Sequence, residues 1–407
     1  MAKRNDEVGD ERDGRRPELS GHRHLPGHVR RADPAVVEAV NRQGQTARPG
    51  PTDREVAAAR DTQRRRRRRW WALGTVLALV ASAVIAWTVL DGPLTGRLPW
   101  SDAQADNPFA GRGLYVQDGT QAADASADAA ATGRSGDAAL LDRLADVPTS
   151  IWLTPEALGQ GRVGSYVRPI AEDAAASGEV AVFVVYGVTD RDCQSAESAG
   201  GLPPEEYASW VGEIASAMAA GNGRAVAVLE PDGLASTFDC PGIAAERVRL
   251  LAGAVGSLVD ANVPTYVDAG HSDWRSVEDM AGLLRQVGVE RVRGFSTNVA
   301  AYQSDADERE YAESLTAALG GEAHYVVDTG RNGGADRPGS QWCNPVPVGP
   351  FGADPGAVED GSHQDARLWI KPPGESDGSG AECAGGPAAG SFWAERALAM
   401  AAASGWG

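Results

Sequence analysis

From about residue 150 onward, short apolar runs alternate with stretches that carry apolar residues at helical spacing. The runs rich in β-branched residues predict strands at 150–153, 180–186, 224–230, 264–268, 292–297, 323–328 and 366–370. The intervening patterns predict helices at 205–220, 244–260, 277–288 and 307–319. This repeated strand–helix order predicts an α/β fold built on a largely parallel sheet or barrel. The Ala/Asp/Gly/Ser-rich stretch 118–137 is expected to be an exposed loop or an irregular helix.

The N-terminal part of the chain has a different pattern. Residues 1–63 are polar without an apolar period, which is typical of disorder. Six arginines at 64–69 precede an uncharged apolar segment, 70–90, which as a helix would span about 30 Å, the thickness of a bilayer core. Because basic residues stay on the cytoplasmic side, we expect a cytoplasmic tail at 1–69, a single transmembrane signal anchor at 70–90 and a linker at 91–106. The following domain, 107–407, would then lie outside the cell membrane.

The arginine run has other interpretations, namely a nucleic-acid-binding patch, part of a twin-arginine signal or the start of a cleaved signal peptide. The apolar segment that follows at once favours a charge run that sets membrane topology. This segment is longer than the usual core of a signal peptide, and the preceding leader is long as well. An uncleaved anchor is therefore the prediction, and secretion after cleavage is the alternative.

Charge and cysteine content narrow the class of ligand. Residues 1–69 carry 18 basic and 11 acidic residues, which leaves 20 and 45 of the chain's 38 and 56 for the rest. Residues 70–407 are so acidic that nucleic acid is not expected as the ligand, whereas a neutral polysaccharide is compatible with this charge. The four cysteines form no CxxC pair and have no neighbouring histidine cluster, so neither a metal site nor a cofactor is expected. Of three possible disulfide pairings we favour Cys193–Cys240 and Cys343–Cys383, because each closes one local excursion of the chain.

Polar side chains follow many of the predicted strands. The groups at these strand ends are Tyr186 with Asp192, Asp232, Asp268 with His271, Asn298, Asp328, and Lys371 with Asp377. In parallel α/β folds such residues meet at one rim. A single aspartate in a loop is more often a helix cap, but repeated carboxylates without metal-type histidines suit glycosidic bond cleavage. No HExxH motif supports a zinc hydrolase.

Tryptophans supply a second indication of a sugar ligand. Trp152, Trp274 and Trp342 lie near predicted strand ends or loops, where an aromatic face can stack on a pyranose ring. A place in the core is equally compatible with their spacing. Trp210 and Trp369 lie within a helical and a strand pattern, respectively, and are expected to pack in the core.

These motifs together resemble glycoside hydrolase family 6, the inverting cellulases. The matching blocks, in the family's order, are 184–186 (VVY), 191–193 (RDC), 229–232 (LEPD), 266–271 (YVDAGH), 297–300 (TNVA), 328–333 (DTGRNG), 342–343 (WC) and 369–375 (WIKPPGE). The resemblance covers roughly 107–407, starting at 107–111 (NPFAG). It implies a distorted parallel β/α barrel of seven strands, the same cysteine pairing, and hydrolysis of β-1,4-glucan with inversion, by a monomer.

The resemblance also implies roles for individual residues. Asp232 would be the general acid, Asp192 would raise its proton affinity and help to relay a proton from the attacking water, and Asp377 would match the debated catalytic base. Tyr186 would lie under the distorted sugar and Ser198 would guide the water. The residues that would bind neighbouring sugars are Asp268, His271, Asn298, Lys371 and Glu375, with Trp152, Trp274 and Trp342 as stacking platforms.

The chain departs from the family pattern at a few positions. Thr189 replaces a usual proline, Gln194 a usual small residue, and Gly233 follows the proposed acid where a larger residue is usual. A glycine there would loosen the acid's loop, which leaves a non-catalytic or weakly active glycan-binding protein as an alternative, beside a hydrolase of another β-glucan. The short loop 378–392 predicts an open cleft and an endo-acting enzyme.

Overall fold

The computed structural model describes residues 102–407 except 192–196, 335–341, 382 and 384. At its centre lies an eight-stranded sheet in the order β1-β2-β3-β4-β5-β6-β8-β7. Its strands are β1 (Ile151–Leu153), β2 (Ala181–Val185), β3 (Ala225–Leu229), β4 (Thr265–Asp268), β5 (Gly294–Thr297), β6 (His324–Asp328), β7 (Gly356–Ala357) and β8 (Gln364–Leu368). All neighbours pair in parallel except β7 and β8. The seven predicted strands and the parallel α/β class are therefore confirmed, and β7 was not predicted because two residues show no alternation.

The sheet is a curled half-barrel rather than a barrel closed by a continuous ladder, since β1 and β7 occupy opposite ends of the strand order. β1 and the end of β8 nevertheless approach each other. The Ser150 N–H donates to the Trp369 carbonyl at 3.0 Å, and the Trp152 indole N–H donates to the Ile370 carbonyl at 2.8 Å. These contacts bring the two sides of the rim together without adding a seventh parallel pairing to the six that the sheet has.

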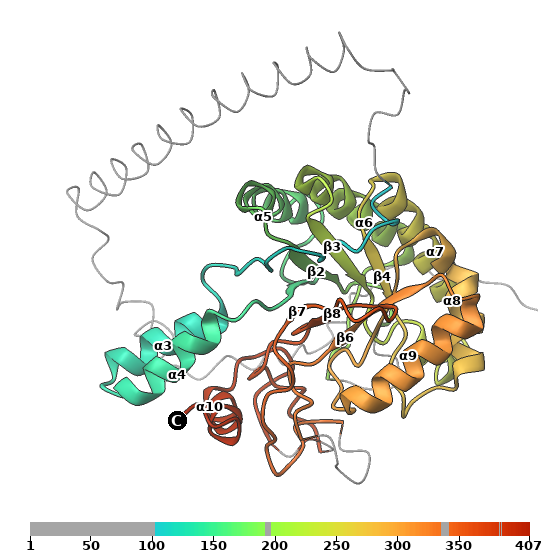
Figure 1. Ribbon diagram of the computed structural model, residues 1–407. Coiled ribbons are helices and arrows are strands. Elements are labelled where there is room, and N and C mark those ends of the chain that lie inside the picture. Colours follow the sequence, from blue (N-terminus) through green and yellow to red (C-terminus); the bar gives the residue numbers. More distant parts are fainter. Residues whose placement is uncertain (1–101, 192–196, 335–341, 382, 384) are drawn as a thin grey trace, which may run out of the picture. The chain divides into compact units, whose positions relative to one another are not determined.

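Helices follow one another around the outside of the sheet (Figure 1). They are α5 (Val163–Ser177), α6 (Pro204–Met218), α7 (Ala244–Asp260), α8 (Val277–Val287) and α9 (Asp305–Leu319). Serine caps explain where two of them start, because Ser276 and Ser304 each accept the backbone N–H of the third residue on. The predicted helix at 244–260 is found with the same bounds.

Two apolar layers lie on the two faces of the strands. Along β2, Ala181, Phe183 and Val185 belong to the layer under the helices, whereas Val182 and Val184 belong to a smaller layer inside the curled sheet. This alternation is the period of a strand buried on both faces. Phe109, from the segment before the first helix, stacks on Tyr266 with ring centroids 6.1 Å apart and completes the inner layer.

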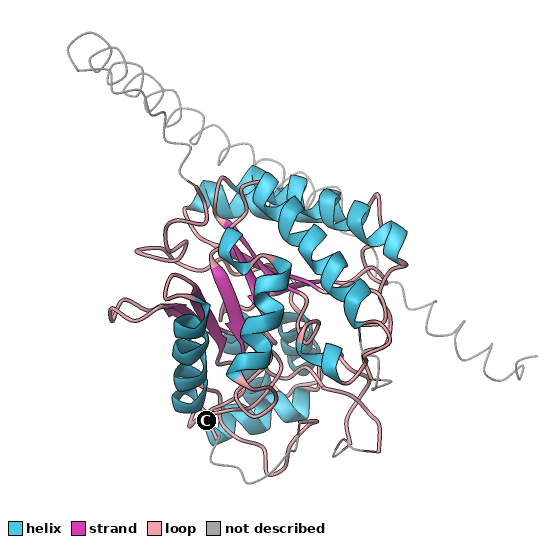
Figure 2. Cartoon of the chain, turned by 90° about the vertical axis from the view of Figure 1, so that its right-hand side faces the viewer, coloured by secondary structure: helices cyan, strands magenta, loops and turns pink. Residues whose placement is uncertain are grey.

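A helical hairpin precedes β1. Its helices α3 (Gln121–Ala131) and α4 (Ser135–Ala145) share an apolar cluster with the C-terminal helix α10 (Ala394–Ala403). Figure 2 shows the molecule from the side, with helices around the strands. The stretch 118–137 is thus mostly regular helix rather than loop. Its alanines favour helix, and Thr120 Oγ1 caps α3 by accepting the Ala123 N–H at 3.3 Å.

The first described residues are packed against the amino ends of the strands. Gln104 donates to the Val263 carbonyl at 2.7 Å and accepts the N–H groups of Thr265 and Arg293 at 3.2 and 2.9 Å. The end of the predicted linker 91–106 therefore docks on the side of the sheet opposite the carboxyl ends. The predicted tail 1–69 and span 70–90 lie outside the described residues. Among the helices of residues 102–407 that the structure describes, none is long and apolar enough to cross a membrane.

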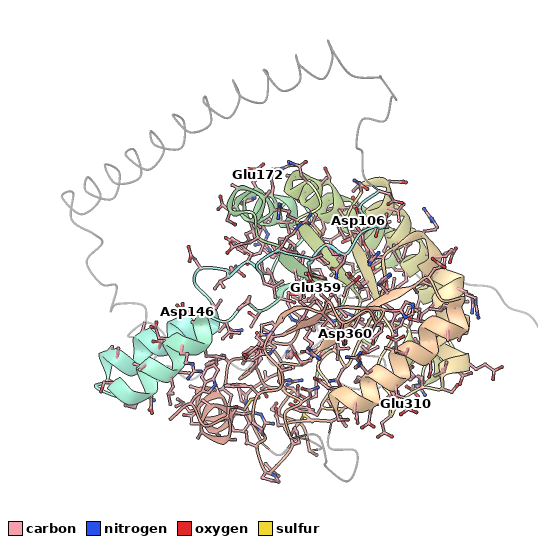
Figure 3. All side chains as sticks on the ribbon, in the orientation of Figure 1. Asp106, Asp146, Glu172, Glu310, Glu359 and Asp360 are labelled. Carbon is pink, nitrogen blue, oxygen red and sulfur yellow. A yellow bond between two sulfur atoms is a disulfide. The ribbon has the colours of Figure 1, made fainter. Side chains whose placement is uncertain are left out.

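Acidic side chains are spread over the surface of the domain. Examples labelled in Figure 3 are Asp106, Asp146, Glu172, Glu310, Glu359 and Asp360, all of them exposed. They belong to several different helices and loops, so the negative charge is spread over the surface and is not gathered in one binding patch.

Candidate active site

The carboxyl ends of the parallel strands bring the predicted polar residues to one rim. Several of these residues adopt a left-handed backbone, with φ of +50° at Glu230, +65° at Asp232 and +62° at Asn298. Such conformations cost of order 1–3 kcal/mol for residues other than glycine and cluster at functional sites. Two of these outliers flank Pro231, so the turn that presents Asp232 is held away from its relaxed conformation.

Asp268 fixes the backbone of Asp232. Its carboxylate accepts the N–H groups of Asp232 and Gly270 at 2.9 and 3.0 Å and the Ser296 hydroxyl at 3.1 Å. Asp268 is 1% exposed, and burial together with the charge of Asp232 raises its pKa well above the ordinary value. Two carboxyls this close resist a double negative charge. The predicted pair Asp232 and Asp268 is therefore brought together at the ends of β3 and β4.

Glu230 joins the strand of the proposed acid to the loop after β2. Its fully buried carboxyl group accepts the N–H groups of Gly187 and Val188 at 2.9–3.1 Å and the Tyr207 hydroxyl at 2.9 Å. Burial raises the pKa of Glu230 to about 7, although these hydrogen bonds act in the other direction. The sequence placed Glu230 beside the acid but gave no reason to assign it a role, since its partners lie far away in the chain.

We expect the stability of the protein to depend on pH through Glu230. Its folded pKa of about 7 exceeds the value near 4.3 of an unfolded glutamate, so its contribution is complete below about pH 4 and is lost as the pH rises through 7. Glu230→Gln does not titrate. The melting temperature of the wild type should therefore fall relative to that of Glu230→Gln between about pH 5 and pH 8.

The matched control for this series is Glu172→Gln, which changes an exposed glutamate on α5. Its melting temperature should follow that of the wild type at every pH. Parallel curves for the wild type and Glu230→Gln would show that Glu230 has the same proton affinity in the folded and unfolded states.

Asp377 is held as a buried anion. Its carboxylate accepts Arg331 Nη1 and the Tyr302 hydroxyl, each at 2.6 Å, and the Asn344 N–H at 3.0 Å. Its side chain is 6% exposed. Burial acts to raise the pKa of Asp377, but the charges of Arg331 and Lys371 and the hydrogen bonds hold it below the ordinary value. Asp377 therefore keeps its negative charge and is a weak base in this arrangement.

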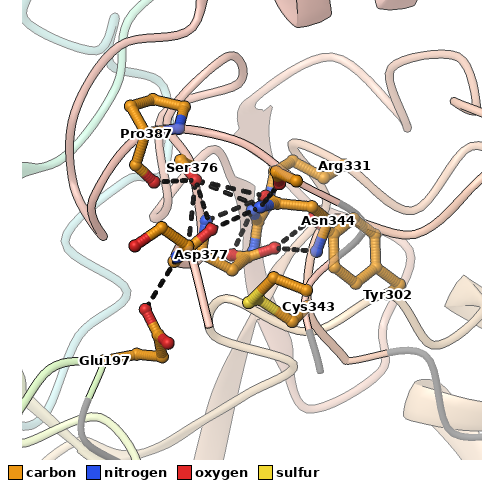
Figure 4. Close-up of a disulfide and its surroundings, with 12 residues drawn as sticks. Glu197, Tyr302, Arg331, Cys343, Asn344, Ser376, Asp377 and Pro387 are labelled. Atoms are coloured by element: carbon orange, nitrogen blue, oxygen red, sulfur yellow. Dashed lines mark hydrogen bonds and ion pairs between the residues drawn. A yellow bond between two sulfur atoms is a disulfide. The ribbon is translucent and has the colours of Figure 1, made fainter. Parts of the chain in front are cut away.

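Asn344 fastens the loop that carries Asp377. Its amide nitrogen donates to the carbonyls of Gly378 and Gly385, both at 2.8 Å, and to Ser376 Oγ at 3.1 Å (Figure 4). Ser376 Oγ in turn donates to the Pro387 carbonyl at 2.8 Å. The sequence motif contained Arg331 but pointed to neither Tyr302 nor Asn344, because these residues reach Asp377 from separate loops.

The Cys343–Cys383 disulfide, predicted from the sequence, is present next to this loop, with Cα atoms 4.7 Å apart. Cys240 is also disulfide-bonded, and its predicted partner Cys193 lies outside the described residues. The predicted catalytic residue Asp192 lies outside them as well. Residues on either side of the undescribed segment 192–196 are in contact, since the Ser198 carbonyl accepts the Arg191 Nε–H at 2.9 Å.

Four predicted site residues meet at the junction of β1, β2 and β8. The rings of Trp152 and Tyr186 meet edge to face, with centroids 5.2 Å apart, and Lys371 Nζ lies 5.1 Å from the Trp152 ring. Lys371 pairs with Glu375 at 3.0 Å. Gln121, which the sequence did not indicate, donates to Glu375 at 3.0 Å from the start of α3. The helical hairpin thereby helps to position Glu375, a residue predicted to bind a sugar.

A second aromatic group lies after β4. The rings of His271 and Trp274 are 5.6 Å apart, and burial lowers the pKa of His271 to about 4, so its imidazole is neutral near pH 7. His271 Nδ1 makes no hydrogen bond within the described part of the chain. A half-buried, neutral imidazole can hydrogen-bond a sugar hydroxyl.

The two remaining residues predicted to bind sugars, Trp342 and Asn298, differ in how far they are exposed to solvent. Trp342 is 44% exposed and can present a ring face to a ligand. Asn298 is fully buried, and its amide bonds the carbonyls of Gln303 and Asp328 at 3.2 and 2.8 Å. Its side chain thus shapes the loop after β5, and its role as a sugar ligand stays a prediction.

Two of the three departures from the family pattern, Gly233 and Thr189, are accommodated by close packing, and the third, Gln194, lies outside the described residues. A Cβ on Gly233 would lie 2.9 Å from the Glu230 carbonyl oxygen, and the Gly233 N–H donates to that oxygen at 2.9 Å. The glycine therefore closes the turn that carries Asp232. Thr189 donates from its hydroxyl to the Leu202 carbonyl at 2.5 Å and so closes the loop after β2. Neither residue loosens the rim.

Arg247, on α7, contacts both the loop after β3 and the loop after β2. Its guanidinium donates to Ser236 Oγ at 2.6 Å and to the Gly233 carbonyl at 3.5 Å, both in the loop after Asp232. It also donates to the carbonyl of Thr189 at 3.2 Å and to that of Asp190. Since Arg247 is 1% exposed, this buried cation couples the loop after β2 to the loop after β3.

We expect Arg247→Met to lower the free energy of unfolding by at least about 1–3 kcal/mol, because buried acceptors in two loops lose their donor. Denaturant unfolding followed by circular dichroism measures this change. Arg249→Met is the matched control, since Arg249 lies on the same helix with a side chain 65% exposed and should change stability little. Equal effects of the two substitutions would exclude the coupling role of Arg247.

Comparisons with known proteins agree with this geometry. The family model described as glycosyl hydrolases family 6 matches residues 109–404. Endoglucanase A of Cellulomonas fimi is 40% identical over 297 residues, which are 72% of this chain and 62% of that protein. A probable 1,4-beta-D-glucan cellobiohydrolase C of Aspergillus niger is 30% identical over 336 residues, covering 70% of this chain and 72% of that protein.

Solved structures show the same likeness. The endoglucanase Cel6 from Mycobacterium tuberculosis, in complex with a thio-linked cellobioside, aligns with a TM-score of 0.65 and 37% identity, covering 74% of this chain and all of that one. The chain therefore belongs to glycosyl hydrolase family 6. It spans 62% and 66% of the length of the first two curated relatives that it matches.

Proposed function

We propose that this protein is an endo-acting β-1,4-glucanase that hydrolyses internal glycosidic bonds with inversion, using Asp232 as the general acid. The observation that carries the proposal is the placement of Asp232 at the end of β3, with its backbone fixed by buried Asp268. Candidates for glucan stacking are Trp152 on β1 and Trp274 in the loop after β4. Relatives named endoglucanase support the same reaction.

In the proposed reaction, Asp232 gives its proton to the glycosidic oxygen while the bond from the anomeric carbon to that oxygen breaks. A water molecule attacks the opposite face of the anomeric carbon, and its proton leaves to a base or to solvent. Ser198 and Asp192 are proposed to guide this water and its proton. Asp377 contributes a fixed negative charge near the developing positive charge, since its lone pairs are largely occupied by Arg331 and Tyr302.

Chain binding is proposed to use the two aromatic groups on either side of Asp232. Tyr186 and Trp152 would bind the sugars on one side, with Lys371 and Glu375 donating and accepting hydroxyl hydrogen bonds. Trp274 and His271 would bind sugars on the other side, and Trp342 would add a stacking face. Flat aromatic rings bury the apolar face of a pyranose at a low cost in conformational entropy.

Endo action is the finer part of the proposal, because curated relatives include cellobiohydrolases as well as endoglucanases. The short loop 378–392 supports it. This loop meets the loop after β2 where the Ser379 N–H donates to Glu197 at 2.8 Å (Figure 4). An endo-acting enzyme should lower the viscosity of carboxymethylcellulose long before many reducing ends appear. A fall in viscosity only in proportion to reducing ends would indicate attack from chain ends.

Membrane attachment of the domain outside the cell is a further part of the proposal, supported by the apolar segment 70–90 after six arginines. The Cys343–Cys383 disulfide suits an oxidising compartment. Residues 103–106 dock at the amino ends of the strands, so a tether there would leave the rim accessible. Detection of the intact chain in washed membranes, with the domain accessible to protease on whole cells, would support an anchor. A shortened chain in the medium would indicate cleavage.

One experiment tests the reaction itself. NMR of cellohexaose during hydrolysis should show the α-anomer of the new reducing end first, since inversion at a β-linkage gives this anomer. Initial formation of the β-anomer would contradict inversion. If the enzyme releases products from a different β-glucan and none from cellohexaose, that glucan is the substrate instead of a β-1,4-glucan.

A further inference from the structure

An exposed phenylalanine lies on the loop that follows the proposed acid. Phe238 ends the short helix η2 (Ala235–Phe238) and is 45% exposed, one of the large apolar side chains of the described residues that face solvent. Single exposed apolar residues are common on protein surfaces. What distinguishes Phe238 is a half-buried guanidinium beside its ring.

That cation is Arg275. Its guanidinium carbon lies 5.3 Å from the Phe238 ring and 5.2 Å from the Trp274 ring, so one side chain contacts both aromatic groups. Arg275 Nε donates to the Ala235 carbonyl at 2.7 Å, and its Nη2 pairs with Asp239. The side chain of Arg275 is only 16% exposed. A cation–π contact of this kind favours the observed orientation of the Phe238 ring.

Phe238 and Trp274 also belong to one continuous stretch of the rim. Gly270, with φ of +68°, is the residue against which both of their loops pack. A Cβ built on it would lie 3.0 Å from the Ala235 methyl group and 3.2 Å from the Trp274 ring. Only a glycine allows this approach, which places η2 directly beside the loop of Trp274.

We propose that Phe238 and Arg275 form a further binding site for a glucosyl unit of a β-1,4-glucan, beyond the one at Trp274. An apolar ring face suits the apolar face of a pyranose, and the guanidinium beside it can donate to ring hydroxyls. The site rests on the proposed function for its ligand. It lies beside Trp274, because η2 packs against the Trp274 loop at Gly270, so a glucan must be long enough to occupy both sites at once.

The test compares ligands of increasing length in an Asp232→Asn background, in which turnover does not consume them. Calorimetric titration of cellobiose, cellotetraose and cellohexaose gives the Kd of each. Adding Phe238→Leu keeps an apolar side chain but removes the flat ring, and should raise the Kd of cellohexaose about 2- to 10-fold with a smaller change for the shorter ligands. Phe238→Tyr keeps the ring and should keep the Kd of cellohexaose.

Unchanged affinity for cellohexaose in Phe238→Leu would overturn the site, as would an equal loss for all three ligands. Hydrolysis of cellohexaose by the wild type, measured beside these titrations, tests the proposed reaction separately from the site. If the wild type fails to hydrolyse cellohexaose but the length-dependent loss of binding is found, the site stands and the reaction does not. If the wild type hydrolyses cellohexaose and no length-dependent loss is found, the reaction stands and the site does not.

Discussion

Asp232→Asn is expected to lower kcat on cello-oligosaccharides by about 10²- to 10⁴-fold, the usual contribution of a general acid, while substrate affinity changes little. The amide of asparagine cannot give up a proton to the glycosidic oxygen. It has nearly the same shape as the carboxyl group it replaces, so the stacking residues on either side of it should still bind the glucan.

The geometry around Asp232 makes this substitution a clean test. Asp268 accepts the backbone N–H of residue 232, not its side chain, so this contact survives the change. Asparagine also tolerates the left-handed φ of +65° at this position better than most residues. Loss of activity would therefore report the missing proton rather than a displaced loop.

Initial rates on cellohexaose and titration of the same oligosaccharide give the two quantities. Asp142→Asn, at an exposed position of α4, is the matched control and should leave both unchanged. A loss of less than about tenfold in Asp232→Asn would assign the acid to another residue. A large loss of affinity would instead place Asp232 among the binding residues.

Much of the fold could be predicted because its signals are local. Each parallel strand is a short β-branched run, and α7 begins and ends at the predicted residues. The rim residues followed from the rule that the carboxyl ends of parallel strands meet, which brought Asp232 and Asp268 together. The α3–α4 hairpin was partly missed because its alanine-rich stretch shows little amphipathic contrast until α10 packs on it.

What the sequence did not show are the residues that hold the proposed catalytic groups in place. Glu230, Arg247 and Arg331 act through partners on other strands or loops, and no local pattern reveals such pairs. The same limit explains the concern about Gly233. As a sequence feature it indicates flexibility, whereas in the fold its missing Cβ lets the turn close on the Glu230 carbonyl.

Arg331→Met is expected to have a large effect on stability, lowering the free energy of unfolding by about 3–5 kcal/mol near pH 7. Both members of the Arg331–Asp377 pair are buried, with side chains 1% and 6% exposed and a contact of 2.6 Å. Without the guanidinium, the Asp377 carboxylate keeps its neutral partners Tyr302 and Asn344 but loses its closest opposite charge. Methionine fills a similar volume, so most of the loss comes from the uncompensated charge.

The pH dependence of this loss identifies its cause. In the wild type the folded pKa of Asp377 is lowered, so its contribution to stability is present above the unfolded value near 3.9 and is lost as the pH falls through the folded value. In Arg331→Met the buried carboxylate prefers its proton. The deficit relative to the wild type should therefore be larger near pH 7 than near pH 4, as measured by urea unfolding at both pH values.

Two further variants separate charge from packing. Arg134→Met breaks an exposed pair with Asp137, whose side chains are 49% and 40% exposed, and should cost no more than about 1 kcal/mol. Arg331→Met combined with Asp377→Asn removes both charges and should recover part of the stability, because no buried ion is left without a partner. If the double variant is less stable than Arg331→Met alone, the arginine acts through its packing and its contacts to other groups, not through Asp377. Recovery of stability without recovery of activity would show that the Asp377 charge is retained for the reaction rather than for the fold.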